Sequence, residues 1–155
     1  MKHLFVIFLL LPLMVASQEK YERKFYELSN TIDFKVISYS KTKMVDVGTT
    51  GGGGAIYEKA KKGYKSIFLW FKIKNKTNAK IIFDLRQFQI VDEDDNVYNA
   101  YLCAGNGLNM KNCDDYELKI KSKKGRQARV YFQPQIPKDK KLKYLRVNGE
   151  DLIEF

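Results

Sequence analysis

Few residues of this chain have the side chains that acid–base or nucleophilic catalysis needs. His3 is the only histidine, and it lies in an apolar N-terminal segment that is typical of a cleaved leader. Without an imidazole, Ser-His-Asp catalysis, Cys-His catalysis and His-ligated metal centres are excluded. The 18 acidic residues could supply a carboxylate pair for glycoside hydrolysis, but no spacing marks out such a pair. We therefore predict that the protein is not an enzyme and holds no cofactor.

The two cysteines, Cys103 and Cys113, lie close together in the segment YLCAGNGLNMKNCDDYEL. In an oxidising compartment, two neighbouring cysteines are expected to pair. Closing a loop this short stabilises a fold by roughly 2–3 kcal/mol. A redox-active dithiol normally uses a C-x-x-C spacing, which is much narrower. The spacing therefore predicts a structural disulfide.

An acidic cluster has the Asp-x-Asp-x-Asn spacing of a calcium loop, at Asp92, Asp94 and Asn96. Val97 stands where the sharp turn of such a loop needs glycine, and no distal glutamate follows. The pattern favours an acidic hairpin turn. A weak extracellular calcium site is the alternative interpretation.

A glycine-rich stretch, residues 48–54 (GTTGGGG), has the composition of a phosphate-binding loop, but no Lys-Ser, Lys-Thr or helical pattern follows it. Together with the basic run at 59–65, it predicts a long flexible loop between the first strand and residues 64–74. Loops over a rigid scaffold often bind ligands. The candidate binding residues are Gly51, Gly52, Gly53, Gly54, Lys61, Lys62 and Tyr64.

Basic residues outnumber acidic ones by 28 to 18, a net charge of +10 that falls by one if the leader with Lys2 is removed. Such an excess favours anionic partners, which are polyanionic glycans or envelope polymers, lipid headgroups or nucleic acid. Surface lysines that only keep strand edges soluble are the alternative explanation. Nucleic acid is not expected as a partner, because nucleotides are scarce outside the cytoplasm.

The elements that must position these residues are strands. Apolar and polar residues alternate through most of the chain, and no segment shows a convincing helical period. In residues 66–74 (SIFLWFKIK) the apolar odd-numbered positions share one face, whereas Phe68 and Trp70 lie on the other. We expect Phe68 and Trp70 to face a second core layer. If they are exposed beside Lys72, they are a second candidate binding surface.

Further strands are expected at 31–39, 80–85, 88–91, 97–102, 128–132, 141–147 and 152–155. The apolar phase of the first changes between Val36 and Ile37, which indicates a β-bulge. Residues 92–96 and the Asn148–Gly149 dipeptide predict hairpin turns. Seven or eight short antiparallel strands in one domain are typical of an all-β, immunoglobulin-like β-sandwich.

The N-terminus predicts export. Residues 4–15 are apolar after Lys2, and Val15 and Ser17 suit the −3 and −1 positions of signal-peptidase cleavage. We expect a signal peptide at 1–17 and a single domain at 18–155, secreted or periplasmic after cleavage near Ser17. No second apolar run is long enough to cross a bilayer.

The order of three motifs carries a family resemblance. The matching residues are Ile73, Asn75 and Asn78, then Phe88, Ile90, Asp92, Asn96 and Tyr98, then Gly125, Val130, Phe132 and Pro137. In this order the chain resembles the bacterial telokin-like, immunoglobulin-like extracellular domain family of unknown function. It departs from that pattern at Asn96, where the family has a turn glycine, and at Pro134, in a longer terminal segment. The resemblance implies an exported, non-enzymatic sandwich and no particular ligand.

Together these patterns predict a non-catalytic domain that mediates binding or interaction in the periplasm or at the cell surface. Its partner would be an unknown protein or an anionic envelope polymer or glycan. A polyanion-binding module is the first alternative, and a carboxylate-dependent glycan hydrolase is a weaker one. Asn75-Lys76-Thr77 also fits the N-glycosylation sequon, which has meaning only in a eukaryotic source.

Overall fold

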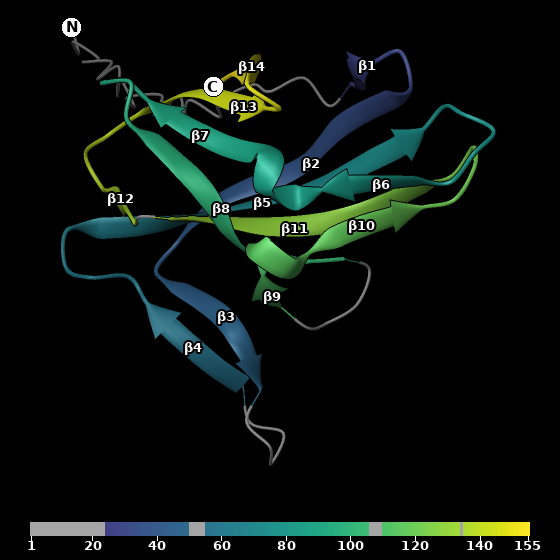
Figure 1. Cartoon of the computed structure of the whole chain (residues 1–155). Helices are drawn as coiled ribbons and strands as arrows, with labels where there is room; N and C mark the ends of the chain where they lie inside the picture. The colour runs from purple at the N-terminus through teal and green to yellow at the C-terminus, as the bar shows by residue number, and fades with distance from the viewer. Residues whose placement is uncertain (1–23, 50–54, 106–109, 134) are drawn as a thin grey trace, which may run out of the picture.

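The computed structural model describes residues 24–49, 55–105, 110–133 and 135–155 (Figure 1). The predicted leader and Gly51–Gly54 lie outside these ranges, as does Pro134. No helix among the described residues has the length and apolar character to span a bilayer. The elements, in chain order, are β1 (Tyr26–Ser29), β2 (Ile32–Thr42), β3 (Met44–Thr49), β4 (Ala55–Lys59), β5 (Tyr64–Asn75), β6 (Ile81–Asp84), η1 (Leu85–Gln87), β7 (Phe88–Asp92), β8 (Val97–Ala104), β9 (Lys111–Asn112), η2 (Cys113–Asp115), β10 (Glu117–Ile120), β11 (Gly125–Gln133), β12 (Ile136–Pro137), β13 (Leu142–Val147) and β14 (Glu150–Glu154).

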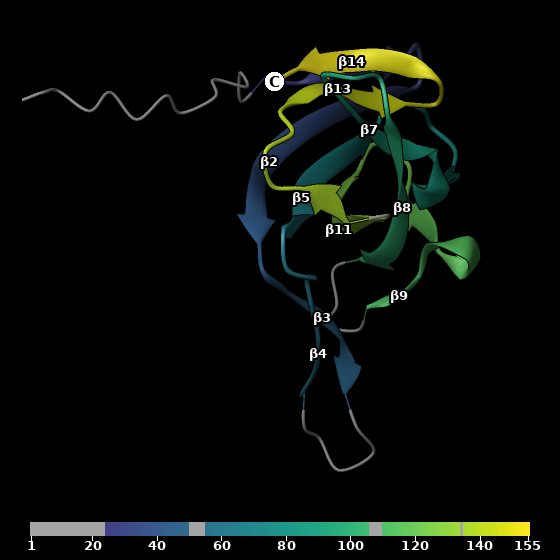
Figure 2. The same cartoon turned by 90° about the vertical axis from the view of Figure 1, so that its left-hand side faces the viewer.

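The predicted all-β, antiparallel fold is confirmed. Eight strands form one continuous path, β1-β2-β5-β11-β8-β7-β13-β14, to which β9 and β12 add short pairings. The sheet curls over on itself, so that β7 and β13 lie over β2, β5 and β11 (Figures 1 and 2). Two smaller antiparallel pairs, β6 with β10 and β3 with β4, complete the described strands.

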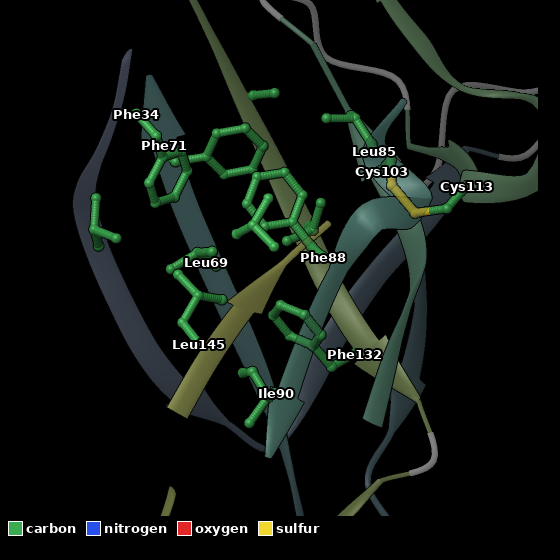
Figure 3. Packing of buried hydrophobic residues seen from close by; sticks show 14 of the residues in the cluster. Phe34, Leu69, Phe71, Leu85, Phe88, Ile90, Cys103, Cys113, Phe132 and Leu145 are labelled. Atoms are coloured by element: carbon green, nitrogen blue, oxygen red, sulfur yellow. A yellow bond between two sulfur atoms is a disulfide. The ribbon is translucent and has the colours of Figure 1, made fainter. Parts of the chain in front are cut away.

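The core fills the space between the two halves of the curled sheet. Strand β5 supplies every second residue from Ile67 to Ile73, all fully buried, as its alternation predicted. The ring of Phe71 packs 4.4 Å from that of Phe88 on β7, and Phe34 on β2 lies 5.5 Å from Phe71 (Figure 3). These aromatic contacts join the two halves directly.

The local turn predictions are confirmed. The β2–β5 register slips between Val36 and Ser38, which places the bulge where the apolar phase changed. Strands β7 and β8 pair across residues 92–96, and β13 pairs with β14. Asn148 and Gly149 both have positive φ, +54° and +82°, as a type I′ turn requires.

The prediction of one long loop between the first strand and residue 64 is wrong. Residues 44–49 and 55–59 pair as the β3–β4 hairpin, which extends away from the sandwich (Figures 1 and 2). The glycine and lysine content of this stretch hid two short segments that can pair with each other. Val45 near the base of the hairpin is only 1 % exposed, so this end is packed rather than free.

The predicted disulfide is confirmed. Cys103 on β8 and Cys113 at the start of η2 are bonded, with Cα atoms 5.2 Å apart, and both are fully buried (Figure 3). The bond ties η2 to β8 across the connection that carries β9.

Candidate functional site

Five lysines gather at the base of the β3–β4 hairpin. Together with Ala60 and Tyr64 they line a hollow of about 470 Å³, which we call the lysine hollow; the lysines are Lys43, Lys59, Lys61, Lys62 and Lys138. Three residues selected from the sequence, Lys61, Lys62 and Tyr64, therefore meet in one place. The sequence-based selection missed the other three lysines.

One wall of the lysine hollow is built by the two ends of the hairpin. Lys43 connects β2 to β3, and its carbonyl oxygen accepts a hydrogen bond of 2.9 Å from the Ala60 amide. The chain then turns at residues 61–64, where the Tyr64 amide donates to the Lys61 carbonyl at 3.0 Å. Gly63 has φ +89° at the third position, as a type II turn requires. This turn presents Lys61 and Lys62.

The opposite wall comes from a distant part of the sequence. The short strand β12 pairs with the beginning of β5, with Pro137 opposite Tyr64. The Lys138 amide donates to the Gly63 carbonyl at 2.9 Å, and the Gln135 side-chain oxygen accepts from the Lys61 amide at 2.7 Å. These bonds hold Lys138 beside the turn, although more than 70 residues separate Lys61 from Gln135.

Lys65 has a different role from the five lysines of the hollow. Its side chain is buried, and its Nζ donates to the carbonyl oxygens of Lys138 and Lys140. It therefore anchors the segment after β12 from within, and its ammonium group is directed to carbonyl oxygens rather than to a ligand.

The lysine hollow concentrates positive charge. Among the described residues, no acidic side chain lines it, and none of its five lysines forms an ion pair. Glu58, which precedes Lys59 on β4, does not line the hollow, and its carboxylate accepts hydrogen bonds of 3.4 Å from the Tyr101 hydroxyl and the Gln135 side chain. Several positive charges that line one hollow raise the local concentration of anions. Phosphate, sulfate and carboxylate groups are the ligands that suit it.

The calcium candidates have other partners. The Asp92 carboxylate is buried and accepts hydrogen bonds from the Tyr98 hydroxyl at 2.7 Å, from the Asn96 side chain, and from the amides of Asp94 and Asn96. Asp94 pairs with Lys140. No group of three or more His, Cys, Asp or Glu side chains within the described ranges could hold a metal ion. The cluster therefore organises a hairpin turn, which is the interpretation that the sequence favoured.

Burial raises the pKa of Asp92, whereas the hydrogen bonds from Tyr98, Asn96 and Asp94 lower it, and the net direction is down. Burial and the neighbouring Asp92 carboxylate raise the pKa of Tyr98. Both shifts keep the pair as carboxylate and neutral phenol at neutral pH, which is the state that the hydrogen bond needs.

Phe68 and Trp70 do not face a second core layer, and that expectation is wrong. Both are half-buried on the face of β5 opposite to Leu69 and Phe71, and neither belongs to the core cluster. Alternation assigned them correctly to the second face, but what covers that face depends on other strands.

Comparison of the chain with known proteins identifies its fold and finds no close relative. No family model matches the chain, and no curated protein matches it. A crystal structure of a conserved hypothetical protein from Bacillus anthracis is similar, with a TM-score of 0.57 and 17% identity over 86% of this chain and 92% of that one. An uncharacterized β-sandwich protein from Clostridium difficile has a TM-score of 0.51 and 13% identity, over 80% of this chain and 88% of that one. These likenesses support a β-sandwich fold, and the telokin-like family is not confirmed.

Proposed function

We propose that this protein is a non-catalytic binding domain that holds an anionic polymer, a glycan or another envelope polymer, at the lysine hollow. The observation that carries the proposal is the set of five lysines from three chain segments, which share one hollow without an acidic partner among the described residues. Solubility alone would spread lysines over the surface, and it does not need a wall assembled by the β12–β5 pairing.

The number of charges favours a polymer over a small anion. One phosphate or sulfate group carries at most two negative charges, fewer than the five positive charges of the hollow. A polymer with many anionic groups neutralises several lysines at once and releases the counterions that both partners had collected. The release of counterions makes such binding strongly dependent on salt.

We also propose that the domain acts after export, in the periplasm or outside the cell. The signal-peptide pattern at residues 1–17 and the disulfide between Cys103 and Cys113 support this location, since disulfides persist in oxidising compartments. Membership of the telokin-like, immunoglobulin-like family stays part of the proposal, supported by the motif order in the sequence and by the β-sandwich fold.

The test compares two variants that lose the same charge in different places. The first replaces Lys59, Lys61 and Lys62 by glutamine. The second replaces Lys119, Lys121 and Lys124, which are exposed around the end of β10. Figure 1 shows this end of β10 on the opposite side of the molecule from β12. Binding to polygalacturonate and to heparin is measured by calorimetry at several salt concentrations.

We expect the hollow variant to lose affinity by about 10- to 100-fold at low salt and to show a shallower salt dependence. The control variant should lose much less, although its net charge is identical. Equal losses in the two variants would show that only net charge matters and would refute a site at the lysine hollow. Circular dichroism spectra of both variants are recorded to check that they are folded.

A further inference from the structure

A second cluster on the outer face of the sheet combines aromatic rings with a guanidinium group. The Arg129 guanidinium lies 5.1 Å from the centre of the Trp70 ring and 5.8 Å from that of Phe68. The ring of Tyr131 lies 5.1 Å from the ring of Phe68. We call these four residues the aromatic platform. Arg129 is exposed, and the three rings are half-exposed.

The strand register explains why these four side chains meet. Trp70 on β5 is opposite Arg129 on β11, and Phe68 is opposite Tyr131. Leu69 and Val130, between them in sequence, are fully buried, so the four platform residues point away from the core. The four side chains therefore form one cluster on the outer face of β5 and β11.

On the β2 side the residues beside the platform are polar or basic, whereas β8 places Ala104 beside Arg129 and Leu102 beside Tyr131. Strand β2 places Ser38 beside Trp70 and Ser40 beside Phe68, and the next register row holds Lys35 and Lys72. These register rows, from Lys35 to Tyr131, contain no acidic side chain. Arg129 forms no ion pair among the described residues. Its guanidinium is thus oriented by the rings while its hydrogen-bond donors remain available.

The platform is a separate contact from the lysine hollow. Tyr64 of the hollow and Trp70 project from the same face of β5, about 20 Å apart at the usual rise of a strand. Ser66 and Phe68 come between them, and Ser66 is only 1 % exposed, so the face is covered at that point. A ligand that contacts both places must be long enough to pass around this covered point, as a polymer is.

Rings and guanidinium together select among anionic polymers. The apolar C–H face of a sugar ring packs well against an aromatic ring. A planar guanidinium can donate two parallel hydrogen bonds to the oxygens of one carboxylate or sulfate. A polyphosphate chain would use the guanidinium but not the rings. We propose that the aromatic platform binds an acidic sugar unit, so that the polymer held by this protein is an acidic polysaccharide.

This inference rests on the proposed function and gives its ligand class. Two sites on one polymer would bind it more tightly than either site alone, because the second contact forms at a high effective concentration. The hollow then supplies charge attraction, and the platform distinguishes a sugar from other anions.

The experiment uses the fluorescence of Trp70, which is the only tryptophan of the chain and so reports directly on the platform. The protein is titrated with an oligogalacturonate of eight sugar units. Parallel titrations use a neutral galactose oligomer of equal length, inorganic polyphosphate and single-stranded oligo-dT. We expect a saturable change in emission with the oligogalacturonate. The other three ligands should produce no comparable change at the same concentrations.

Variants separate the two sites. Arg129→Gln should weaken oligogalacturonate binding about tenfold or more, because a charged hydrogen-bond pair is lost. Lys119→Gln, an exposed charge on β10, is the matched control and should not change the affinity measurably. The triple glutamine variant of the hollow should weaken binding but keep the Trp70 response at saturation.

Each failure has a distinct meaning. If oligogalacturonate binds in calorimetry without any change in Trp70 emission, the platform inference is wrong and the lysine hollow stands. An equal response to the neutral oligomer would show that Arg129 does not select an acidic sugar. An equal response to oligo-dT would show that the rings bind nucleobases rather than sugars. If the Trp70 response and the Arg129 effect appear but the hollow variants bind normally, the proposed function of the hollow fails instead.

Discussion

At the scale of single residues, buried polar side chains hold the turns of this domain. Asp92 is fully buried, yet donors from Tyr98, Asn96 and Asp94 surround its carboxylate. In the acidic sequence DEDDN, Asp92 is thus buried and stabilises the turn, whereas the four residues that follow it are exposed to solvent. Burying a carboxylate costs free energy unless such donors compensate for the lost water.

We predict that Asp92→Asn destabilises the fold by about 1–3 kcal/mol at pH 7, because an amide NH₂ would face donors instead of accepting from them. The effect should depend on pH. The hydrogen bonds keep the pKa of folded Asp92 below its unfolded value, so its contribution is present above about pH 4 and is lost as the pH falls through the folded value. Urea unfolding at pH 7 and pH 3 should therefore show a smaller difference between wild type and variant at pH 3.

The control for Asp92 is Asp95→Asn in the same turn. Asp95 is exposed, and its φ of +64° is a conformation that asparagine tolerates. The Asp95→Asn substitution should change the free energy of unfolding little at either pH. A difference between wild type and Asp92→Asn that is the same at both pH values would contradict the stabilising role of the Asp92 charge.

Asn75, the asparagine of the sequon, is a second buried polar side chain whose hydrogen bonds hold a turn. It is fully buried, and its side-chain nitrogen donates to the carbonyl oxygens of Ala79 and Lys121 at 2.7 and 3.2 Å. Its side-chain oxygen accepts from the Thr77 amide and hydroxyl, both at 2.8 Å. The amide that a glycan would modify is thus enclosed in the folded domain, so the motif serves the turn after β5.

At the scale of elements, the turn at residues 61–64 links the stability of the domain to the shape of the lysine hollow. Gly63 has φ +89°, a region that side chains with a Cβ rarely adopt. A Cβ built at Gly63 meets no atom within 4 Å, so any cost of a substitution comes from the backbone alone.

We predict that Gly63→Ala destabilises the fold by about 1–2 kcal/mol. Gly63→Asn should cost less, because asparagine tolerates positive φ better. Urea unfolding curves measure both, with unchanged slopes if only the folded turn is strained. Equal stability of wild type and Gly63→Ala would show that the turn can relax. The hollow would then be less firmly built than its hydrogen bonds indicate.

Local patterns predicted most strands but not how distant strands meet. Alternation located β5, and the phase change at Val36 located the bulge, because both depend only on neighbouring residues. The pairings of β6 with β10 and of β12 with β5 join segments far apart in sequence, and no local signal specifies them. For the same reason Lys61 and Lys62 could be selected from the sequence, whereas Lys138 could not. The register of β5 with β11 likewise brings Phe68 and Trp70, which sequence reasoning had assigned to a core layer, together with Arg129 and Tyr131 in the aromatic platform.

At the scale of the whole molecule, acidic and basic residues are distributed unevenly. None of the described ion pairs includes a lysine of the hollow: they join Lys140 with Asp94, Lys143 with Asp95, Arg146 with Asp151, Arg86 with Asp84, and Lys76 with Glu27 and Asp33. The acidic side chains thus neutralise other basic ones and leave the hollow positive. Mutual repulsion of its five lysines works against folding. A site of this kind therefore binds anions but lowers the stability of the folded domain.

We therefore predict that the glutamine variant of Lys59, Lys61 and Lys62 is more heat-stable than wild type at low ionic strength, by about 2–4 °C in Tm. The control variant of Lys119, Lys121 and Lys124 should gain less, since those lysines do not share a hollow. At about 1 M salt, where charges are screened beyond about 3 Å, the gain of the hollow variant should vanish. Calorimetric melts at low and high salt measure both effects. An equal gain in the two variants, or a gain that persists at high salt, would mean that the lysines of the hollow do not repel one another as a group, and the charge argument for the site would lose its basis.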